Sequence, residues 1–411
     1  MSLLTDRLIA PDMAPHEARN ARRHVAALSL SKLSDGLVDP KLVLSWLLGT
    51  MGVPAAFIGM LVPIREAGAL LPQIVLGGWL TRLRQRRWVW VTGSAVQGAA
   101  AIGIALTALW TGGVLAGMLV CALLAGLAVA RAACSVSYKD ILGKTVGQSR
   151  RGAVTGLAGS VSAAAVVIFA ALMLTGVLKS QDALIAAIAV AGLAWLVAAM
   201  VLAGLREQDS TPDDASPVET YREILRRDAN LRRFILVRGL LVSTALAPPY
   251  MVLLTAQEGG ALGTLGAMLL ASSVAAFVSS YVWGRLADRD SARVLALAGG
   301  FAGMAMLAAM AAQVIGLAQG PGVIPAILFV LMLAYHGVRQ ARSVYLVDIS
   351  DPELRAQNAA IANIAIGGIL LLAGVIGGGL SFIGPLGALA GFAAMALAGG
   401  AFALTLRRVA E

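Results

Sequence analysis

The chain has 411 residues, of which 59% are hydrophobic and only 13% are charged. A soluble globular protein is about half apolar and about a quarter charged, so this composition excludes an ordinary soluble enzyme. The 32 Lys and Arg residues outnumber the 22 Asp and Glu residues, which gives a formal net charge of +10. In a chain this apolar, the excess positive charge must first be assigned to the two sides of a membrane. We therefore expect no nucleic-acid partner.

Apolar runs of about 20 residues, each long enough to cross the roughly 30 Å hydrocarbon core of a bilayer, follow one another along the chain. Charged residues, Gly and Pro divide them into predicted helices at 24–48, 54–80, 88–110, 113–137, 152–177 and 182–205, and then at 233–255, 261–284, 293–317, 322–346, 355–379 and 384–407. We therefore expect an all-α polytopic membrane protein with twelve transmembrane helices in two pseudo-symmetric six-helix halves.

The polar segments between and beyond these runs define the expected domains. Residues 1–23 form a polar tail in which we read no signal peptide, and 24–205 form the N-terminal half. A linker at 206–232 contains a short amphipathic helix that is predicted to begin near Pro217. The C-terminal half covers 233–407 and a short tail covers 408–411.

The loop charges predict the orientation of the chain. With twelve spans, nearly all loop Lys and Arg residues fall on the side of the two termini and the linker, whereas the alternate loops contain only Lys179. Cytoplasmic loops carry an excess of Lys and Arg, so both termini and the linker are predicted to be cytoplasmic. An odd number of spans would scramble this pattern.

An internal repeat relates the two halves at an offset of about 208 residues. The segment from Arg131 to Asp140 aligns with the segment from Arg339 to Asp348, and both lie at the predicted cytoplasmic end of the fourth helix of their half. Such a parallel duplication predicts a pseudo-axis along the membrane normal and a cavity between the halves.

The loop after the eighth predicted helix resembles a known family motif. Its sequence Gly284-Arg-Leu-Ala-Asp288-Arg289-Asp-Ser-Ala-Arg293 is similar to the G-x-x-x-D-R-x-G-R-[RK] motif of the major facilitator superfamily. The resemblance implies a rocker-switch secondary transporter rather than an enzyme. Such a transporter would work as a monomer in a bacterial inner membrane. The family's antiporter signature is missing, because Gly152, Gly156 and Gly159 occur without its proline.

Cytoplasmic charges are expected to form a gate. In the resembled family, contacts of the loop motif hold the cytoplasmic side closed in the outward-facing state. The candidates here are Arg82, Asp140, Arg151, Asp288, Arg289, Asp348 and Arg355. The alternative is that these residues serve only as a positive-inside signal.

Carboxylates within the spans are candidates for proton coupling, because an ionised group in the bilayer costs about 2.5 to 3.5 kcal/mol and should face a cavity or a partner. Lys32, Asp35 and Asp39 follow the spacing of one helical stripe, and Pro40 predicts a local break in the helix. Matching depths predict a pair between Asp39 and Arg65. Asp35, Asp39 and Glu66 are the coupling candidates, and the alternative is a purely structural ion-pair cluster.

Embedded cations are candidates for binding the solute. They are Lys32, Arg65, Arg131, Arg238, His336 and Arg339. Arg131 and Arg339 are expected at equivalent depths, where two guanidinium groups could grip a carboxylate or phosphate bidentately. The alternatives are that they snorkel or bond Asp140 and Asp348, that Arg238 snorkels, and that His336 is a satisfied polar group.

These features together predict a secondary active transporter. It would move a small anionic or zwitterionic solute by alternating access, driven by the proton gradient and without a cofactor or metal, and export is one direction this allows. The alternatives are an uncoupled organic-anion facilitator or uptake permease, and a transporter-like membrane protein in pigment or lipid handling or in complex assembly.

Overall fold

The computed structural model describes residues 15–209, 225–226, 228–255, 262–320, 322–351 and 354–407. Within these ranges the chain forms helices and no β-strand, which confirms the predicted all-α class. The predicted linker helix near Pro217 and the tail at 408–411 lie outside the described residues.

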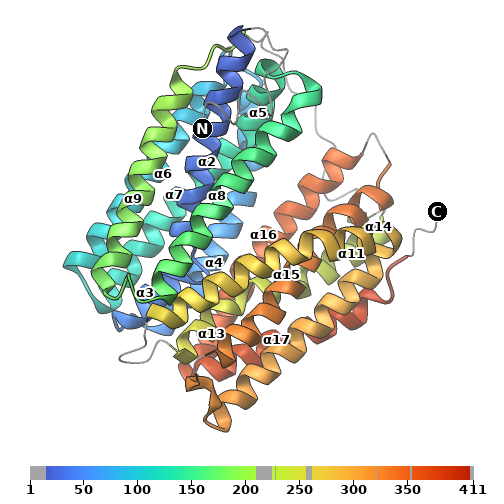
Figure 1. The fold of residues 1–411 in the computed structure, drawn as a ribbon. Coiled ribbons are helices and arrows are strands. Elements are labelled where there is room, and N and C mark those ends of the chain that lie inside the picture. Colours follow the sequence, from blue (N-terminus) through green and yellow to red (C-terminus); the bar gives the residue numbers. More distant parts are fainter. Residues whose placement is uncertain are drawn as a thin grey trace.

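The N-terminal half is drawn in blue to green in Figure 1. Its helices are α2 (Pro15–Leu37), α3 (Val43–Thr50), α4 (Ala55–Leu70), α5 (Gln73–Leu80), α6 (Arg87–Trp110), α7 (Gly113–Thr145), the 3₁₀ helix η1 (Gln148–Arg150), α8 (Arg151–Leu174) and α9 (Gln181–Ala203). α2 begins inside the predicted tail 1–23, and α7 continues past its predicted end at 137. These helix ends differ from the predicted limits, because hydropathy marks the embedded stretch whereas a helix can continue into water.

The C-terminal half is drawn in yellow to red in Figure 1. It contains α11 (Ala229–Leu241), α12 (Ser243–Leu246), α13 (Pro248–Thr255), α14 (Leu262–Val314), the 3₁₀ helix η2 (Leu317–Gln319), α15 (Val323–Ile349), α16 (Arg355–Leu380), the 3₁₀ helix η3 (Ser381–Ile383) and α17 (Pro385–Ala403). α11, α12 and α13 together occupy the predicted seventh span.

Ten helices in the described part of the chain are long and apolar enough to cross a membrane. Two differences account for the predicted twelve. α14 is counted once although its 53 residues cover both the eighth and the ninth predicted spans. The first predicted span is divided into α2 and α3 and is not counted. The arrangement of twelve spans is therefore the predicted one.

The bend between the eighth and ninth spans lies at Asp290, whose φ of −158° and ψ of 89° interrupt the helical backbone. Its Oδ1 accepts a hydrogen bond from the backbone N–H of Arg293 at 2.9 Å, and its Oδ2 lies 3.0 Å from Nε of the same residue. Asp290 thus acts as the N-cap of the ninth span. The acidic residues of the family-like loop therefore differ in role, since Asp290 caps a helix and Asp288 is exposed.

The first span is broken where Pro40 predicts a break. α2 ends at Leu37 and α3 begins at Val43. Between them, Oδ1 of Asp39 accepts hydrogen bonds from the backbone N–H groups of Lys41 at 2.6 Å and Leu42 at 3.2 Å. The carboxylate satisfies backbone donors that the interrupted helix leaves unpaired, which makes the break tolerable inside a membrane.

The two halves touch at one end and diverge toward the end at which α2 begins (Figure 1). α4 packs against α16, α8 packs against α14, and α13 packs against α3. Small residues allow these close approaches: a Cβ added to Gly266 of α14 would lie 2.6 Å from the backbone N of Leu174 in α8. Among the described residues, no ion pair joins one half to the other.

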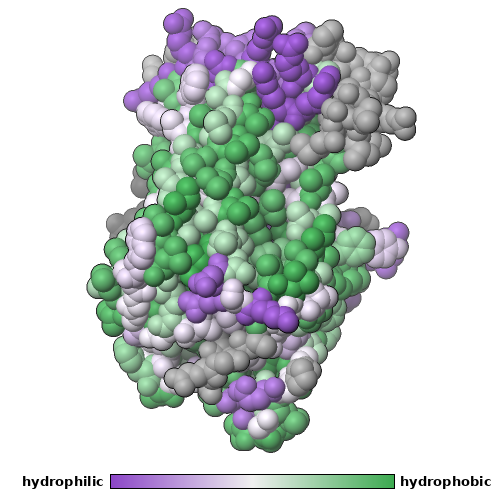
Figure 2. All heavy atoms as spheres, turned by 60° about the vertical axis from the view of Figure 1, so that its left-hand side comes forward, coloured by the Kyte–Doolittle hydropathy of each residue, from purple (hydrophilic) through white to green (hydrophobic). Residues whose placement is uncertain are grey.

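The outer surface is apolar in a band beneath a hydrophilic cap. Figure 2 shows this cap at the end where α2 begins and green, hydrophobic side chains below it. Large side chains such as Trp110, Phe277 and Phe382 are exposed. Exposed apolar area on this scale is unfavourable in water and requires a lipid environment, so the chain is an integral membrane protein.

Candidate functional site

Asp35 of α2 is the centre of an ion-pair network within the N-terminal half. Its Oδ1 lies 2.7 Å from Nη2 of Arg65 in α4, and its Oδ2 lies 2.6 Å from Nη2 of Arg131 in α7. Nη1 of Arg131 also donates to Oγ of Ser31 at 3.2 Å, and Ser31 accepts a further hydrogen bond from Nε1 of Trp195 at 3.1 Å. One carboxylate is therefore shared by two guanidinium groups, and three helices meet at it.

The predicted pair between Asp39 and Arg65 is wrong, because Arg65 binds Asp35 instead. The helical stripe ends with α2 at Leu37, so Asp39 lies in the break and its carboxylate accepts backbone N–H groups. The predicted bond between Arg131 and Asp140 is also wrong. Asp140 pairs with Arg86 and Lys144 of the N-terminal half.

Lys32 lies beside this network, one helical turn before Asp35. Its Nζ donates to the backbone carbonyl of Thr155 in α8 at 3.5 Å, and its side chain is half-buried. Three cationic side chains, those of Lys32, Arg65 and Arg131, therefore lie around the single carboxylate of Asp35.

A second cluster joins the two halves at Lys41. Its Nζ lies 3.6 Å from Oε1 of Glu66 in α4 and 3.8 Å from the centre of the Tyr335 ring in α15. Because Tyr335 belongs to the C-terminal half, a single ammonium group contacts both halves through an ion pair and a cation–π interaction. The Glu66 side chain remains 38% exposed.

A small pocket of about 40 Å³ lies between the halves next to this cluster. Glu66 and Leu70 of α4 form one wall, and the C-terminal half supplies the remainder. The polar and charged side chains on that side are Arg238, Thr244, Tyr335, Arg339 and Arg342. The pocket thus has one carboxylate on the N-terminal side and three guanidinium groups on the other.

Arg238 is the most buried of these cations, with a relative exposure of 6%. Its Nη2 donates to Oδ1 of Asn363 at 3.0 Å, while its Nε is buried without a hydrogen-bond partner in the described structure. No carboxylate of a described residue forms an ion pair with Arg238, Arg339 or Arg342. The Arg238 side chain is buried in the protein and bonded to Asn363, so it does not extend to the surface as a snorkelling side chain would.

His336 and Arg339 differ in their surroundings. The His336 ring packs against Tyr335 at a centroid distance of 5.1 Å, and His336 is not among the residues that line the pocket. Arg339 lines the pocket and is exposed. Arg131 lies 14 residues before the end of α7 at Thr145, whereas Arg339 lies 10 residues before the end of α15 at Ile349. The two arginines therefore differ by about one helical turn in their distance from the end of their helix, and their equivalence of depth in the membrane stays a prediction.

The end of the N-terminal half that is predicted to be cytoplasmic contains a network that sequence reasoning missed. Asp140 binds Arg86 at 2.6 Å and Lys144 at 2.5 Å, and Lys144 lies 3.4 Å from Oε1 of Glu207. The Glu207 side chain is fully buried and accepts the backbone N–H groups of Arg86 and Arg87. Glu207 therefore attaches the start of the linker to the loop between α5 and α6.

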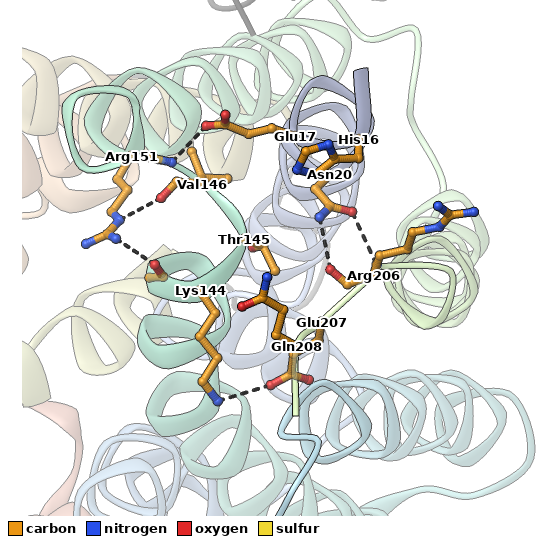
Figure 3. Close-up of a pocket in the computed structure, with 12 residues that line it drawn as sticks. His16, Glu17, Asn20, Lys144, Thr145, Val146, Arg151, Arg206, Glu207 and Gln208 are labelled. Carbon is orange, nitrogen blue, oxygen red and sulfur yellow. Dashed lines mark hydrogen bonds and ion pairs between the residues drawn. The ribbon is translucent and has the colours of Figure 1, made fainter. Parts of the chain in front are cut away.

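Figure 3 shows the neighbouring cavity, of about 570 Å³, with Lys144 directed at Glu207 and Arg151 directed at the end of α7. Nε of Arg151 donates to the carbonyl of Val146, and its Nη2 donates to that of Gly143. Arg355 repeats this contact in the other half, with its Nε 3.4 Å from the carbonyl of Ser350. Both arginines thus stabilise the carboxyl end of the preceding helix.

The other gate candidates are exposed. Arg82, Asp288, Arg289 and Asp348 lie on the surface and form no ion pair with another described residue. The halves diverge at this end (Figure 1), and no ion pair between described residues joins them there. The gate assigned to these residues stays a prediction.

Solved transporters share this fold along nearly the whole chain. A POT family transporter, solved in complex with a thioalcohol-conjugated peptide, matches with a TM-score of 0.70 and 11% identity over 98% of each chain. A D-xylose–proton symporter matches with a TM-score of 0.66 and 14% identity over 94% of this chain and 98% of its own. A bacterial homologue of the iron transporter ferroportin, in an inward-facing state, has the same TM-score and coverage at 15% identity.

No known family profile and no curated protein matches the chain by sequence. The identities to the solved structures are low, and the likeness therefore establishes the fold. That fold is the one expected from the motif around Asp288.

Proposed function

We propose that this chain, which has the major facilitator fold, is a secondary transporter that moves a small anionic or zwitterionic solute by alternating access. The observation that carries the proposal is Arg238, a buried guanidinium group without a carboxylate partner among the described residues. Burying an unpaired charge costs several kcal/mol, so such a group is retained where a ligand supplies the opposite charge.

The pocket offers the chemistry for such a ligand. Arg339 and Arg342 line it together with Arg238, and guanidinium groups bind carboxylates and phosphates bidentately. Glu66 on the opposite wall offers a partner for an ammonium group. A solute that carries an anion, or an anion and an ammonium group, fits this distribution of charge.

The carboxylates support coupling to protons. Glu66 is partly exposed and binds Lys41, which in turn contacts Tyr335 of the other half. Protonation of Glu66 would release the ammonium group that bridges the halves, and so connect a proton to their relative position. Asp35 offers a second proton acceptor, whose protonation would separate Arg65 from Arg131. No cofactor is required, since the proton gradient supplies the driving force.

The arrangement of the halves supports an inward-facing state. They diverge at the end that carries the predicted cytoplasmic loops (Figure 1). In the alternate state, Arg82 of one half and the loop at Asp288 and Arg289 of the other would approach and close this end. The proposal allows export as well as uptake.

The test is transport by purified protein in liposomes with an imposed pH gradient, with carboxylates, organic phosphates and amino acids as candidate solutes. Flux that follows the gradient, and that becomes nearly independent of it in Asp35→Asn and Glu66→Gln, supports coupled transport. Arg285→Gln is a matched control, because Arg285 is exposed and stacks on Tyr281 outside the pocket. If flux is independent of the pH gradient and both carboxylate variants transport normally, the protein is an uncoupled facilitator. If Arg238→Met, which removes the charge, leaves anion transport unchanged, the assigned solute class is wrong.

A further inference from the structure

Two adjoining hollows on the lipid-facing surface of the N-terminal half form one groove between α6 and α7. The first, of about 590 Å³, lies at the end where α6 begins, and the second, of about 570 Å³, continues it along the helices. Trp79, Val89 and Thr92 line both hollows, which makes them continuous. Their volumes lie in the range of ligand sites, about 300 to 1,000 Å³.

The inner part of the groove is apolar and has a floor of small residues. Val96 and Val129 form its sides, and Ala125, Gly126 and Ala133 lie along α7. A Cβ added to Gly126 would meet no atom within 4 Å, so the groove is open above this residue. From Val89 to Val96, α6 advances by about 10 Å, a length suited to part of an acyl chain.

The outer part of the groove combines two indoles with one cation and one anion. Trp79 and Trp88 are 48% and 47% exposed, and tryptophan prefers the headgroup level of a bilayer. Arg84 lines this part and forms no ion pair with a described residue. Asp209 also lines this part, and its Oδ1 accepts a hydrogen bond from Nε2 of Gln85 at 2.9 Å.

Further contacts hold these walls in place. Oε1 of Gln85 accepts hydrogen bonds from Nε1 of Trp88 at 3.2 Å and from Nη2 of Arg87 at 3.0 Å. The four arginines of this loop therefore differ. Arg86 and Arg87 bind groups of the protein, whereas the Arg84 guanidinium is directed to no carboxylate among the described residues.

We infer that this groove is a binding site for a single zwitterionic phospholipid, with its phosphate on Arg84, its ammonium group on Asp209 and an acyl chain above Gly126. The charge pattern selects this class, because a headgroup with a phosphate and an ammonium group pairs with both residues. A headgroup that carries only negative charge would meet the Asp209 carboxylate unpaired. The site lies outside the pocket between the halves, and it stands whether or not the proposed transport function is correct.

The test is native mass spectrometry of the full-length protein, released from nanodiscs that contain phosphatidylethanolamine, phosphatidylcholine and phosphatidylglycerol in equal amounts. We expect one tightly retained lipid per protein, with either ammonium-bearing lipid preferred over phosphatidylglycerol. Arg84→Gln should weaken retention by about tenfold, the effect of losing a charge-assisted hydrogen bond. Gly126→Phe should reduce it similarly by filling the groove.

Matched controls are Lys139→Gln, an exposed cation at the same end of the molecule, and Val190→Phe, which adds bulk to the lipid-facing side of α9. Both should retain lipid like the unmodified protein. Asp209→Asn should remove the preference over phosphatidylglycerol while phospholipid is still retained. Equal retention of all three lipids by the unmodified protein, or unchanged retention in both Arg84→Gln and Gly126→Phe, would overturn the assignment.

Discussion

Replacement of Arg238 by methionine should make the protein more stable and less able to bind its solute. In the absence of solute the buried Nε lacks a hydrogen-bond partner among the described residues, and such an unsatisfied group costs about 1 to 3 kcal/mol. The substitution removes this cost but also removes the hydrogen bond to Asn363, worth about 1 kcal/mol. Methionine follows the same path through the packed surroundings with little change in volume.

The expected net change is a stabilisation of about 1 kcal/mol, which for a chain of this size raises Tm by about 1 to 2 °C. Solute binding should fall by about 100-fold, because two charge-assisted hydrogen bonds to an anion contribute about 3 kcal/mol together. The two measurements are thermal unfolding in detergent without solute, and equilibrium binding of the solute identified in the liposome assay.

Arg285→Met is the control, since it removes an exposed cation from outside the pocket and should change neither Tm nor affinity. The reasoning would be refuted if Arg238→Met lowered Tm by several degrees and left solute affinity unchanged. That result would identify Arg238 as a structural residue, stabilised by contacts that outweigh its desolvation.

Three further predictions concern coupling and movement. Glu66→Gln should make solute flux nearly independent of the pH gradient, because it removes the proton acceptor that binds Lys41; flux that still follows the gradient would assign coupling elsewhere. Gly266→Leu should favour separation of the halves near α8, since even a Cβ there would lie 2.6 Å from the backbone N of Leu174. The labelling of a cysteine placed at the α8 end of the interface between the halves should then rise. Unchanged labelling would contradict the role of the contact between Gly266 and Leu174. Asp288→Ala should slow turnover while solute affinity stays within about twofold, since the exposed residue lies outside the pocket; normal turnover would remove it from the gate.

Much of the fold could be predicted because it depends on local properties of the chain. A segment in hydrocarbon must satisfy its own backbone hydrogen bonds, so each long apolar run predicts a helix. The break at Pro40 was equally predictable, because proline removes a backbone donor wherever it lies in a helix. The helix ends at Thr145 and Ile349 could not be read in this way, since hydropathy does not mark where a helix stops in water.

The candidate site was predictable as a set of residues but not as a set of partners. Asp35, Arg65 and Arg131 could each be identified as costly embedded charges, yet their pairing depends on how three helices rotate and pack. A change of one residue in helical register rotates a side chain by about 100°. The depth argument for Asp39 failed for this reason, because the break turned its carboxylate toward the backbone.

The sequence by itself determined that this chain is a two-fold repeated bundle of membrane helices, because hydropathy, loop charge and internal repetition are properties of short segments. Only the tertiary structure decided that Asp35 is shared by two arginines, that Arg238 lacks a carboxylate partner among the described residues, and that Glu207 accepts the backbone N–H of Arg86 across 121 residues of sequence. The physical reason is that an ion pair requires two groups within about 4 Å, and helix packing alone determines which groups meet that distance.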